Sequence, residues 1–222
     1  MLQMRDLPLA RQRLLIRQDL NVPLSNGKIS DNTRLKAVLD TIAFAHNSGA
    51  TVMIMSHLGR PKEGSVEPLL SLKPIASALS VLLEMPVNFA EDWIEGFEAQ
   101  AGSITLFENV RFLKGEQSND EELAKKMASL CDIFVNDAFA TAHRAHASTH
   151  GVAKYASIAC SGPLLTAEIT ALNTALENPK RPLVAVVGGA KVSTKLEIIQ
   201  SLLGKVDSLI VGGGIANTCL KA

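Results

Sequence analysis

Four stretches of the chain share one layout, in which a short apolar run leads into a polar loop that carries an arginine. They are LLIRQDLNVP (residues 14–23), TVMIMSHLGRP (51–61), SITLFENVRF (103–112) and CDIFVNDAFATAHRAH (131–146). Apolar runs of four or five residues with polar flanks are typical of strands buried on both faces of a parallel sheet. In such a sheet the loops at the carboxyl ends of neighbouring strands open onto one crevice. We therefore expect the polar side chains of these loops to converge.

The residues expected in the crevice are Asp19, His57, Arg60, Arg111 and Arg144. Guanidiniums that face one cleft repel each other unless an anion with several negative groups lies between them, so the pattern predicts a site for a small phosphorylated acid. Taken singly, each arginine is more often a surface or ion-pair residue, and only the repetition favours a site. Asp19 and Asn21 either satisfy local backbone groups in a turn, or bind a substrate hydroxyl or position a guanidinium; we favour the second.

The fourth stretch also allows a metal site. His143, His146 and His150 are spaced i, i+3, i+7, which on a helix would place three imidazoles on one face and indicate zinc or iron. Arg144 lies among them, however, and cationic surroundings disfavour a metal ion. We therefore expect no metal site here.

Composition excludes several classes of function. Lys plus Arg and Asp plus Glu both number 22, so no global positive field exists to hold nucleic acid or an anionic membrane. The three cysteines, Cys131, Cys160 and Cys219, are far apart and without a CxxC pair, which argues against disulfides or a thiolate zinc site and favours a reducing compartment. Cys131 begins an expected strand and fits a core residue better than a nucleophile. Charges interrupt the amino terminus before signal-peptide length, and we expect a cytoplasmic protein.

Helical patterns lie between the expected strands, at residues 31–47, 71–84 and 118–130. In the first, Leu35, Val38 and Ile42 follow the spacing of one helix face, with Gly49 as a stop signal. The third opens on Ser118 with Glu121 three positions later, a capping-box pattern. Strands that alternate with helices of this length predict an α/β fold with a doubly wound, Rossmann-like parallel sheet.

A second unit is expected after a connecting helix at residues 164–178, because Pro179 and Pro182 stop that helix. The predicted order is then a strand at 183–187, the turn GGAK at 188–191, a helix at 192–203, a strand at 208–211 and three glycines. The expected division is 1–165, a connecting helix and hinge at 166–182, and a partial α/β domain at 183–222.

The segment GGAKVSTK (188–195) is a second candidate for anion binding. Glycines after a strand let the backbone approach a phosphate, and the free amides of the next helix point at it. Lys191 and Lys195 would then lie one helical turn apart. The spacing is neither that of a P-loop nor GxGxxG, and a tight turn with solvated lysines is the alternative.

Six segments carry a family resemblance: DLNVP, SHLGRP, FENVRF, NDAFATAHRAHAS, GGAKVSTKL and GGGIANT, in this order from residue 19 to residue 218. The chain resembles phosphoglycerate kinase over essentially its whole length. The resemblance implies a glycolytic transferase that moves the acyl phosphate of 1,3-bisphosphoglycerate to ADP, with Mg²⁺, giving 3-phosphoglycerate and ATP. It also implies that the amino-terminal domain binds the acid, that the carboxy-terminal domain binds the nucleotide, and that the two close around a hinge.

Carried over by position, the resemblance implies phosphoglycerate contacts by Asp19, Leu20, Asn21, Arg34, His57, Leu58, Gly59, Arg60, Arg111 and Arg144. It implies nucleotide contacts by Gly189, Ala190, Lys195, Gly213 and Gly214. The catalytic residues it implies are Arg34, which reaches the transferring phosphoryl group, and Lys191, which follows that group between the substrates. Such a set fits phosphoryl transfer, which needs positioning and charge neutralisation rather than a protein nucleophile.

Two departures from the family pattern matter. Ala140 stands where the family usually has glycine, so a positive φ at this position would strain the loop that carries Arg144. The chain also stops at Ala222, soon after GGGIANT, whereas the family's second domain continues with the rest of the adenosine pocket and the Mg²⁺-binding aspartate. We therefore expect these 222 residues to bind 3-phosphoglycerate but to be inactive alone.

Two further readings remain. The first is a non-catalytic phosphoglycerate-binding fragment or interaction module. The second, a Rossmann-type dehydrogenase, is not supported, because this sequence lacks both GxGxxG and the acidic residue that should follow it. The intact family is expected to be monomeric, whereas exposed strands at 183–187 and 208–211 offer a route to self-association.

Overall fold

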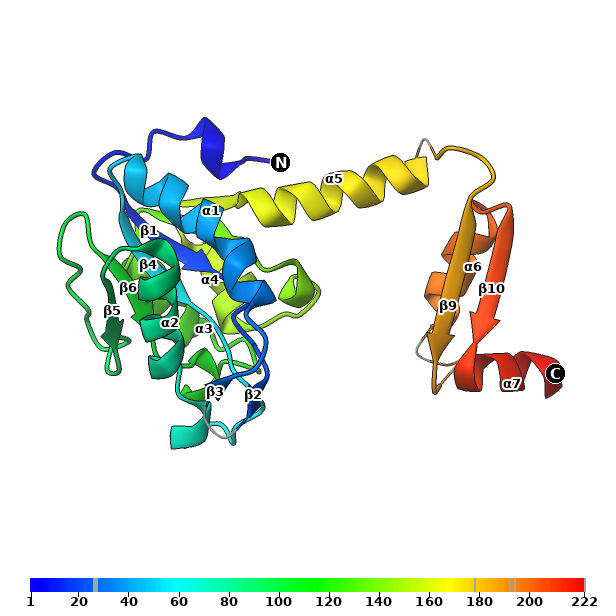
Figure 1. The fold of residues 1–222 in the computed structure, drawn as a ribbon, viewed down its shortest axis with the longest axis horizontal. Helices are drawn as coiled ribbons and strands as arrows, with labels where there is room; N and C mark the ends of the chain where they lie inside the picture. Colours follow the sequence, from blue (N-terminus) through cyan, green and yellow to red (C-terminus); the bar gives the residue numbers. More distant parts are fainter. Residues whose placement is uncertain (26–27, 178, 192, 194, 222) are drawn as a thin grey trace. The chain divides into compact units, whose positions relative to one another are not determined.

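The computed structural model describes residues 1–25, 28–177, 179–191, 193 and 195–221, and it divides into two compact units at Glu168 and Ile169 (Figure 1). The first unit holds a six-stranded sheet in the order β5-β6-β4-β1-β7-β8, and all its neighbouring strands are parallel. The strands are β1 (Arg13–Arg17), β4 (Thr51–Met55), β5 (Val87–Ala90), β6 (Ile104–Phe107), β7 (Ile133–Asn136) and β8 (Ile158–Ser161). Strand order reverses beside β1, as in a doubly wound sheet. The predicted fold class is confirmed.

The four predicted strands form the middle of this sheet. Every residue of β4 and β6 is buried, and β1 and β7 each have one residue that is not. The outer strands β5 and β8 were not predicted, and both are only partly buried. A short antiparallel pair, β2 (Leu24–Ser25) and β3 (Lys28–Ile29), lies outside the main sheet.

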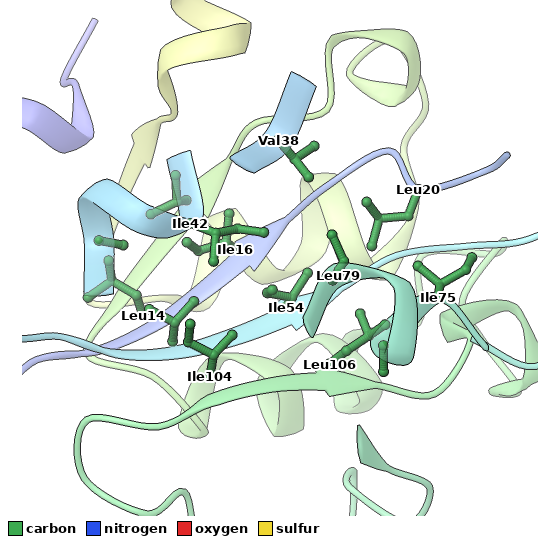
Figure 2. Packing of buried hydrophobic residues seen from close by; sticks show 14 of the residues in the cluster. Leu14, Ile16, Leu20, Val38, Ile42, Ile54, Ile75, Leu79, Ile104 and Leu106 are labelled. Carbon is green, nitrogen blue, oxygen red and sulfur yellow. The ribbon is translucent and has the colours of Figure 1, made fainter. Parts of the chain in front are cut away.

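Helices cover both faces of the sheet. On one face α1 (Thr33–Asn47) and α2 (Lys73–Leu83) pack on alternate residues of the central strands, and Figure 2 shows Ile42 and Leu79 pointing toward Ile16 and Ile54. On the other face α3 (Glu121–Ser129) and α4 (Val152–Tyr155) pack on the intervening residues, Leu15 among them. The period of two in a strand divides its side chains between these two cores.

Trp93 belongs to the second core. It is 2% exposed, and its ring stacks on that of Phe107 with centroids 4.5 Å apart. This is the packing role that an isolated aromatic residue suggests. Burial of a side chain of this kind is worth about 1.5 to 3 kcal/mol or more.

Of the two predicted helix ends, the stop at Gly49 is confirmed and the cap at Ser118 is not. Gly49 follows α1 with φ of 82°, a conformation that favours glycine. The predicted cap at Ser118 is wrong, because α3 begins later: the carboxylate of Asp120 accepts a hydrogen bond from Leu123 N at 2.8 Å, while Ser118 Oγ donates to the Gly115 carbonyl. An aspartate at the N-cap position, directly before the helix, is as good a cap as serine.

Single helical turns lie in the segments outside the longer helices and the strands. They are η1 (Met4–Asp6), η2 (Pro68–Leu70), η3 (Val110–Phe112), η4 (Phe139–Thr141) and η5 (Ala147–Gly151, a π-helix). Ala140 lies within η4 and is not among the described residues with positive φ. The strain considered for this alanine is therefore absent from its loop.

The second unit is small. Helix α5 (Pro163–Glu177) begins in the first unit and ends in the second, where β9 (Val184–Gly189) and β10 (Ser208–Gly212) form a parallel pair with α6 (Leu196–Leu203) and α7 (Gly213–Lys221). The helix predicted from residue 192 begins at Leu196 instead; residues 192 and 194, and residue 178 of the predicted connecting helix, lie outside the described residues. In the described part of the chain, no helix is both long and apolar enough to cross a membrane.

Candidate anion-binding site

Three of the predicted arginines line one hollow at the carboxyl ends of the strands. Arg60 follows β4, Arg111 follows β6 and Arg144 follows β7, and with Pro61, Gln117 and His146 they line a space of about 460 Å³. Arg111 is 7% exposed, and its guanidinium donates a hydrogen bond to the Gly59 carbonyl. The side chain is thereby held in place before any ligand arrives.

Asp19, Asn21 and Arg34 form a second group, at the end of β1. Arg34 Nη1 donates to Asp19 Oδ2 at 2.9 Å and to the Asn21 carbonyl at 3.0 Å. Asp19 Oδ1 also accepts from Asn21 N at 3.2 Å, and Asn21 Oδ1 accepts from Gly59 N at 2.9 Å. The side chains therefore close a local turn, and Asp19 also positions a guanidinium, whereas binding of a substrate hydroxyl stays a prediction. A second hollow, of about 170 Å³, is lined by Asp19, Arg34 and Ala140 among others.

The backbone amides of Leu20 and Leu58 hold in place the loops that carry the site residues. Both side chains are buried in the core cluster beneath α1 and α2. Leu20 N donates a hydrogen bond to Ser56 Oγ at 2.9 Å, and Leu58 N donates one to Asn109 Oδ1 at 3.3 Å. These bonds anchor the loops on which Asn21 and Gly59 lie.

Sequence reasoning missed a buried polar chain behind the first hollow. Arg17, the last residue of β1, is 2% exposed, and its Nη2 lies 3.2 Å from Nδ1 of His57. Arg17 Nε donates to Ser148 Oγ at 3.1 Å, and Ser148 Oγ lies 2.6 Å from Oε1 of Glu116, which is 1% exposed. The one available signal was an arginine that directly ends an apolar strand.

Positive charge exceeds negative charge in this region. The charges that act on His57, Arg17 and Arg111 include five guanidiniums, Arg17, Arg34, Arg60, Arg111 and Arg144, and two carboxylates, Asp19 and Glu116. Burial, followed by repulsion from other arginines, lowers the pKa of Arg17 to about 10 and that of Arg111 below its usual range. Burial and the neighbouring guanidiniums lower the pKa of His57 to about 2, so the imidazole is neutral at physiological pH. An excess of cations around one crevice suits a multivalent anion.

The three histidines considered for a metal do not lie on one helix face. His143 is exposed, His146 precedes η5 with Nδ1 3.7 Å from Glu116 Oε1, and His150 Nδ1 lies 3.2 Å from Asn119 Nδ2. Among the described residues, no group of three or more His, Cys, Asp or Glu is placed to hold a metal ion.

In the second unit, glycines let the end of β9 and the start of α7 approach each other closely. Gly189 bridges Gly213, whose φ is 64°, and a Cβ on Gly214 would lie 2.6 Å from the Ala190 carbonyl oxygen. Larger residues would push β9 and the start of α7 apart. Lys191 is exposed and lies outside regular structure, and Lys195 caps α6 rather than lying within it, so the expected helical pairing of these two lysines is wrong.

Fold and charge together define the first unit as a doubly wound α/β domain with a cationic crevice at the carboxyl ends of its strands. The sequence model of the phosphoglycerate kinase family matches residues 4–222. The chain is 56% identical over 222 residues to phosphoglycerate kinase of Legionella pneumophila. The aligned region covers 100% of this chain and 56% of the Legionella protein. The chain belongs to the phosphoglycerate kinase family.

Solved structures agree with this assignment. Phosphoglycerate kinase from Coxiella burnetii superposes with a TM-score of 0.91 at 59% identity, covering 99% of this chain and 56% of that one. The enzyme from Pyrococcus horikoshii gives a TM-score of 0.84 at 34% identity, covering 98% and 56%. The chain therefore spans about half the length of the relatives it matches.

Proposed function

We propose that this chain supplies the acid-binding half and part of the nucleotide-binding half of a phosphoglycerate kinase. The reaction is reversible transfer of the acyl phosphate of 1,3-bisphosphoglycerate to ADP, giving 3-phosphoglycerate and ATP in glycolysis. The observation that carries the proposal is the gathering of Arg60, Arg111 and Arg144 around one hollow in a member of this family.

The two groups at the strand ends divide the acid between them. Arg60, Arg111 and Arg144 hold the phosphate ester, because three guanidiniums offer paired donors to a dianion. Arg34, oriented by Asp19, serves the carboxylate end and the transferring phosphoryl group. Asn21 and Gly59 complete the wall through polar and backbone groups.

The second unit takes the nucleotide phosphates in this proposal. Gly189, Ala190, Gly213 and Gly214 bring backbone close to backbone at the ends of β9 and β10. Lys191 directly follows Ala190, and Lys195 is the residue before α6. A nucleotide phosphate at the first amides of α7 would meet no side chain from Gly213 or Gly214 themselves. Mg²⁺ accompanies the nucleotide by family resemblance, but the described residues contain no cluster of ligands that fits it.

The chain's own contribution to catalysis is position and charge. Phosphoryl transfer passes through a transition state with charge spread over the phosphoryl oxygens, and cationic groups held in place lower its energy. Arg34 and Lys191 are the residues proposed to contact the transferring group. His57 stays neutral and therefore acts as a hydrogen-bonding group rather than as an acid.

Titration calorimetry of the 222-residue chain with 3-phosphoglycerate tests the proposal. The wild-type chain should bind, and Arg34→Ala, Arg60→Ala and Arg144→Ala should each weaken binding by about 1.5 to 3 kcal/mol, the scale of a charged hydrogen bond. Arg13→Ala is the matched control, since Arg13 begins β1 at the opposite end of the sheet and pairs with Asp132. Absence of binding by the wild-type chain, or equal losses in the control, would refute the site.

The alternative, binding without turnover, is our proposal for these 222 residues alone, because relatives are nearly twice as long. The same polypeptide exposes apolar side chains in its second unit, Val186 (71%), Leu203 (62%) and Ile210 (54%), and we propose that it self-associates there at high concentration. A cytoplasmic location completes the proposal, consistent with three cysteines that are all unpaired.

A further inference from the structure

The buried chain behind the hollow links four side chains in a fixed order. Glu116 Oε1 lies 2.6 Å from Ser148 Oγ, Ser148 Oγ lies 3.1 Å from Arg17 Nε, and Arg17 Nη2 lies 3.2 Å from His57 Nδ1. All four side chains are at most 5% exposed. Water therefore competes little for these bonds, and an unmade bond among them is expensive.

Proton positions in this chain follow from chemistry. A guanidinium has only donors, so Arg17 donates at both ends, to Ser148 Oγ and to His57 Nδ1. Ser148 has one hydroxyl proton and a lone pair occupied by Arg17, so that proton goes to Glu116 Oε1. Glu116 Oε2 accepts from Ser148 N at 2.9 Å, which fixes the carboxylate. His57 must then carry no proton on Nδ1.

We propose that Glu116 and Ser148 are positioning residues of the acid site: through Arg17 they hold His57 as the tautomer protonated on Nε2, a neutral hydrogen-bond donor to the bound phosphoglycerate. Among the hydrogen bonds of the described residues, none uses Nε2 of His57, so this donor is available to a ligand. The inference deepens the proposed function and rests on it for the identity of the ligand.

The surroundings of His57 favour the neutral ring independently. The charged groups that act on it are Arg17 from β1, Arg34 from α1, Arg111 from η3 and Arg144 from the loop after η4. All four are cations, and together with burial they oppose a proton on the second nitrogen. The tautomer should therefore persist across the range in which a histidine ordinarily titrates.

Ser148 also explains why Arg17 faces the ring. Besides Ser148 and His57, the guanidinium contacts only the Gln18 carbonyl in the described structure, through Nη1. Loss of the hydroxyl leaves the buried Nε–H without an acceptor, and the guanidinium will turn to find one. Nδ1 of His57 then loses its fixed donor, and both neutral tautomers become populated.

Two-bond ¹H–¹⁵N correlation spectra of the ligand-free 222-residue chain, with ¹⁵N-labelled histidine, test the inference directly. His57→Gln identifies the signals of His57 among the five histidines. We expect an unprotonated Nδ1 and a protonated Nε2, unchanged from about pH 5 to pH 8. A proton on Nδ1, or titration of the ring in that range, would overturn the inference without any binding measurement.

Variants separate positioning from the site itself. Ser148→Ala should give His57 signals averaged between the two tautomers and should weaken 3-phosphoglycerate binding about tenfold. Ser118→Ala, an exposed serine in the preceding loop, should change neither. If Ser148→Ala does not fold, Glu116→Gln should give the same averaging of the His57 signals. The two oxygens of Glu116 accept from Ser148 N and Ser148 Oγ, whereas the glutamine amide has only one acceptor oxygen for these two donors.

The outcomes distinguish the two proposals. Failure of the wild-type chain to bind 3-phosphoglycerate would refute the proposed function. Normal binding by the wild-type chain, with wild-type spectra and affinity in Ser148→Ala or Glu116→Gln, would leave that function standing and refute the positioning role.

Discussion

Replacing Asp137 by asparagine tests whether its buried negative charge is needed where β7 ends. Asp137 is 2% exposed and accepts four hydrogen bonds. Two are at Oδ2, from Gln18 Nε2 (3.0 Å) and Thr41 Oγ1 (2.7 Å), and two are at Oδ1, from the backbone amides of Leu164 (2.8 Å) and Leu165 (3.1 Å) at the start of α5. The carboxylate thus joins the residue after β1 to α1 and α5.

The structure predicts stability losses of different size for two substitutions. Asp137→Ala removes the acceptor of four donors, and at about 1 kcal/mol each, the low end for a buried unpaired group, unfolding should become about 4 kcal/mol easier. Asp137→Asn keeps Oδ1 for the two backbone amides. Its new amide faces Gln18, whose Oε1 is buried without a partner among the described residues, so a flip of Gln18 supplies the acceptor. Thr41 can rotate its hydroxyl, and we expect a change below about 1 kcal/mol.

The pH dependence has a definite sign. Burial raises the pKa of Asp137 more than its four hydrogen bonds lower it. Because the folded pKa lies above the unfolded value of about 3.9, ionisation of Asp137 destabilises the fold as pH rises through that window. Asparagine does not ionise, so the variant should gain on the wild type as pH rises from the unfolded pKa through the higher folded pKa.

Urea unfolding followed by tryptophan fluorescence measures these effects. Trp93 is the single tryptophan and lies in the core of the first unit, so its signal reports that unit. Asp132→Asn is the control, since Asp132 lies at the other end of the sheet in an exposed pair with Arg13. The reasoning is wrong if asparagine destabilises as much as alanine does, or if the variant loses stability relative to the wild type as pH rises.

Four further outcomes follow from the same structure. Affinity for 3-phosphoglycerate should fall as salt shortens the Debye length to about 10 Å or less, and calorimetry that shows no change would indicate a site of neutral hydrogen bonds. The pKa values of Cys131 and Cys160 are raised to about 12 by burial, so a thiol reagent at pH 8 should modify exposed Cys219 first, as mass mapping would show. A coupled ATP-formation assay should detect no turnover by the 222-residue chain, since losing part of the in-line geometry costs orders of magnitude; robust activity would contradict this. Phe107→Ala should cost about 3 to 5 kcal/mol in urea unfolding, because its ring packs between Trp93 and Phe97.

The central strands were predictable because burial on both faces leaves a continuous apolar run. The edge strands were not. The sequence of β5, VNFA, carries a polar residue, and that of β8, IACS, consists largely of small residues. An edge strand is covered by fewer neighbours, so fewer of its residues need to be large and apolar. Neither pattern rises above that of a loop.

The arginines in the loops after the strands were predictable from the sequence, and the buried groups that hold them in place were not. Glu116 lies in the polar run KGEQSND and looks solvated, yet it is buried because Ala147 N donates to its carbonyl and Ser148 packs on its carboxylate. Those contacts join residues about thirty positions apart. A local pattern contains no trace of such a pairing, whereas a strand followed by an arginine is itself local.

Arg17 and Glu116 are joined through the hydroxyl of Ser148 rather than by a direct ion pair. Buried charges cost several kcal/mol each to desolvate, and apolar residues in their place are often as stable or more so, so stability alone gives little reason to keep this pair. A direct ion pair would occupy the guanidinium with the carboxylate. With Ser148 between them, Glu116 still offsets the repulsion among five arginines, while Nη2 of Arg17 remains turned to His57. The arrangement stabilises a cationic crevice without filling it, as a site for a phosphorylated acid requires.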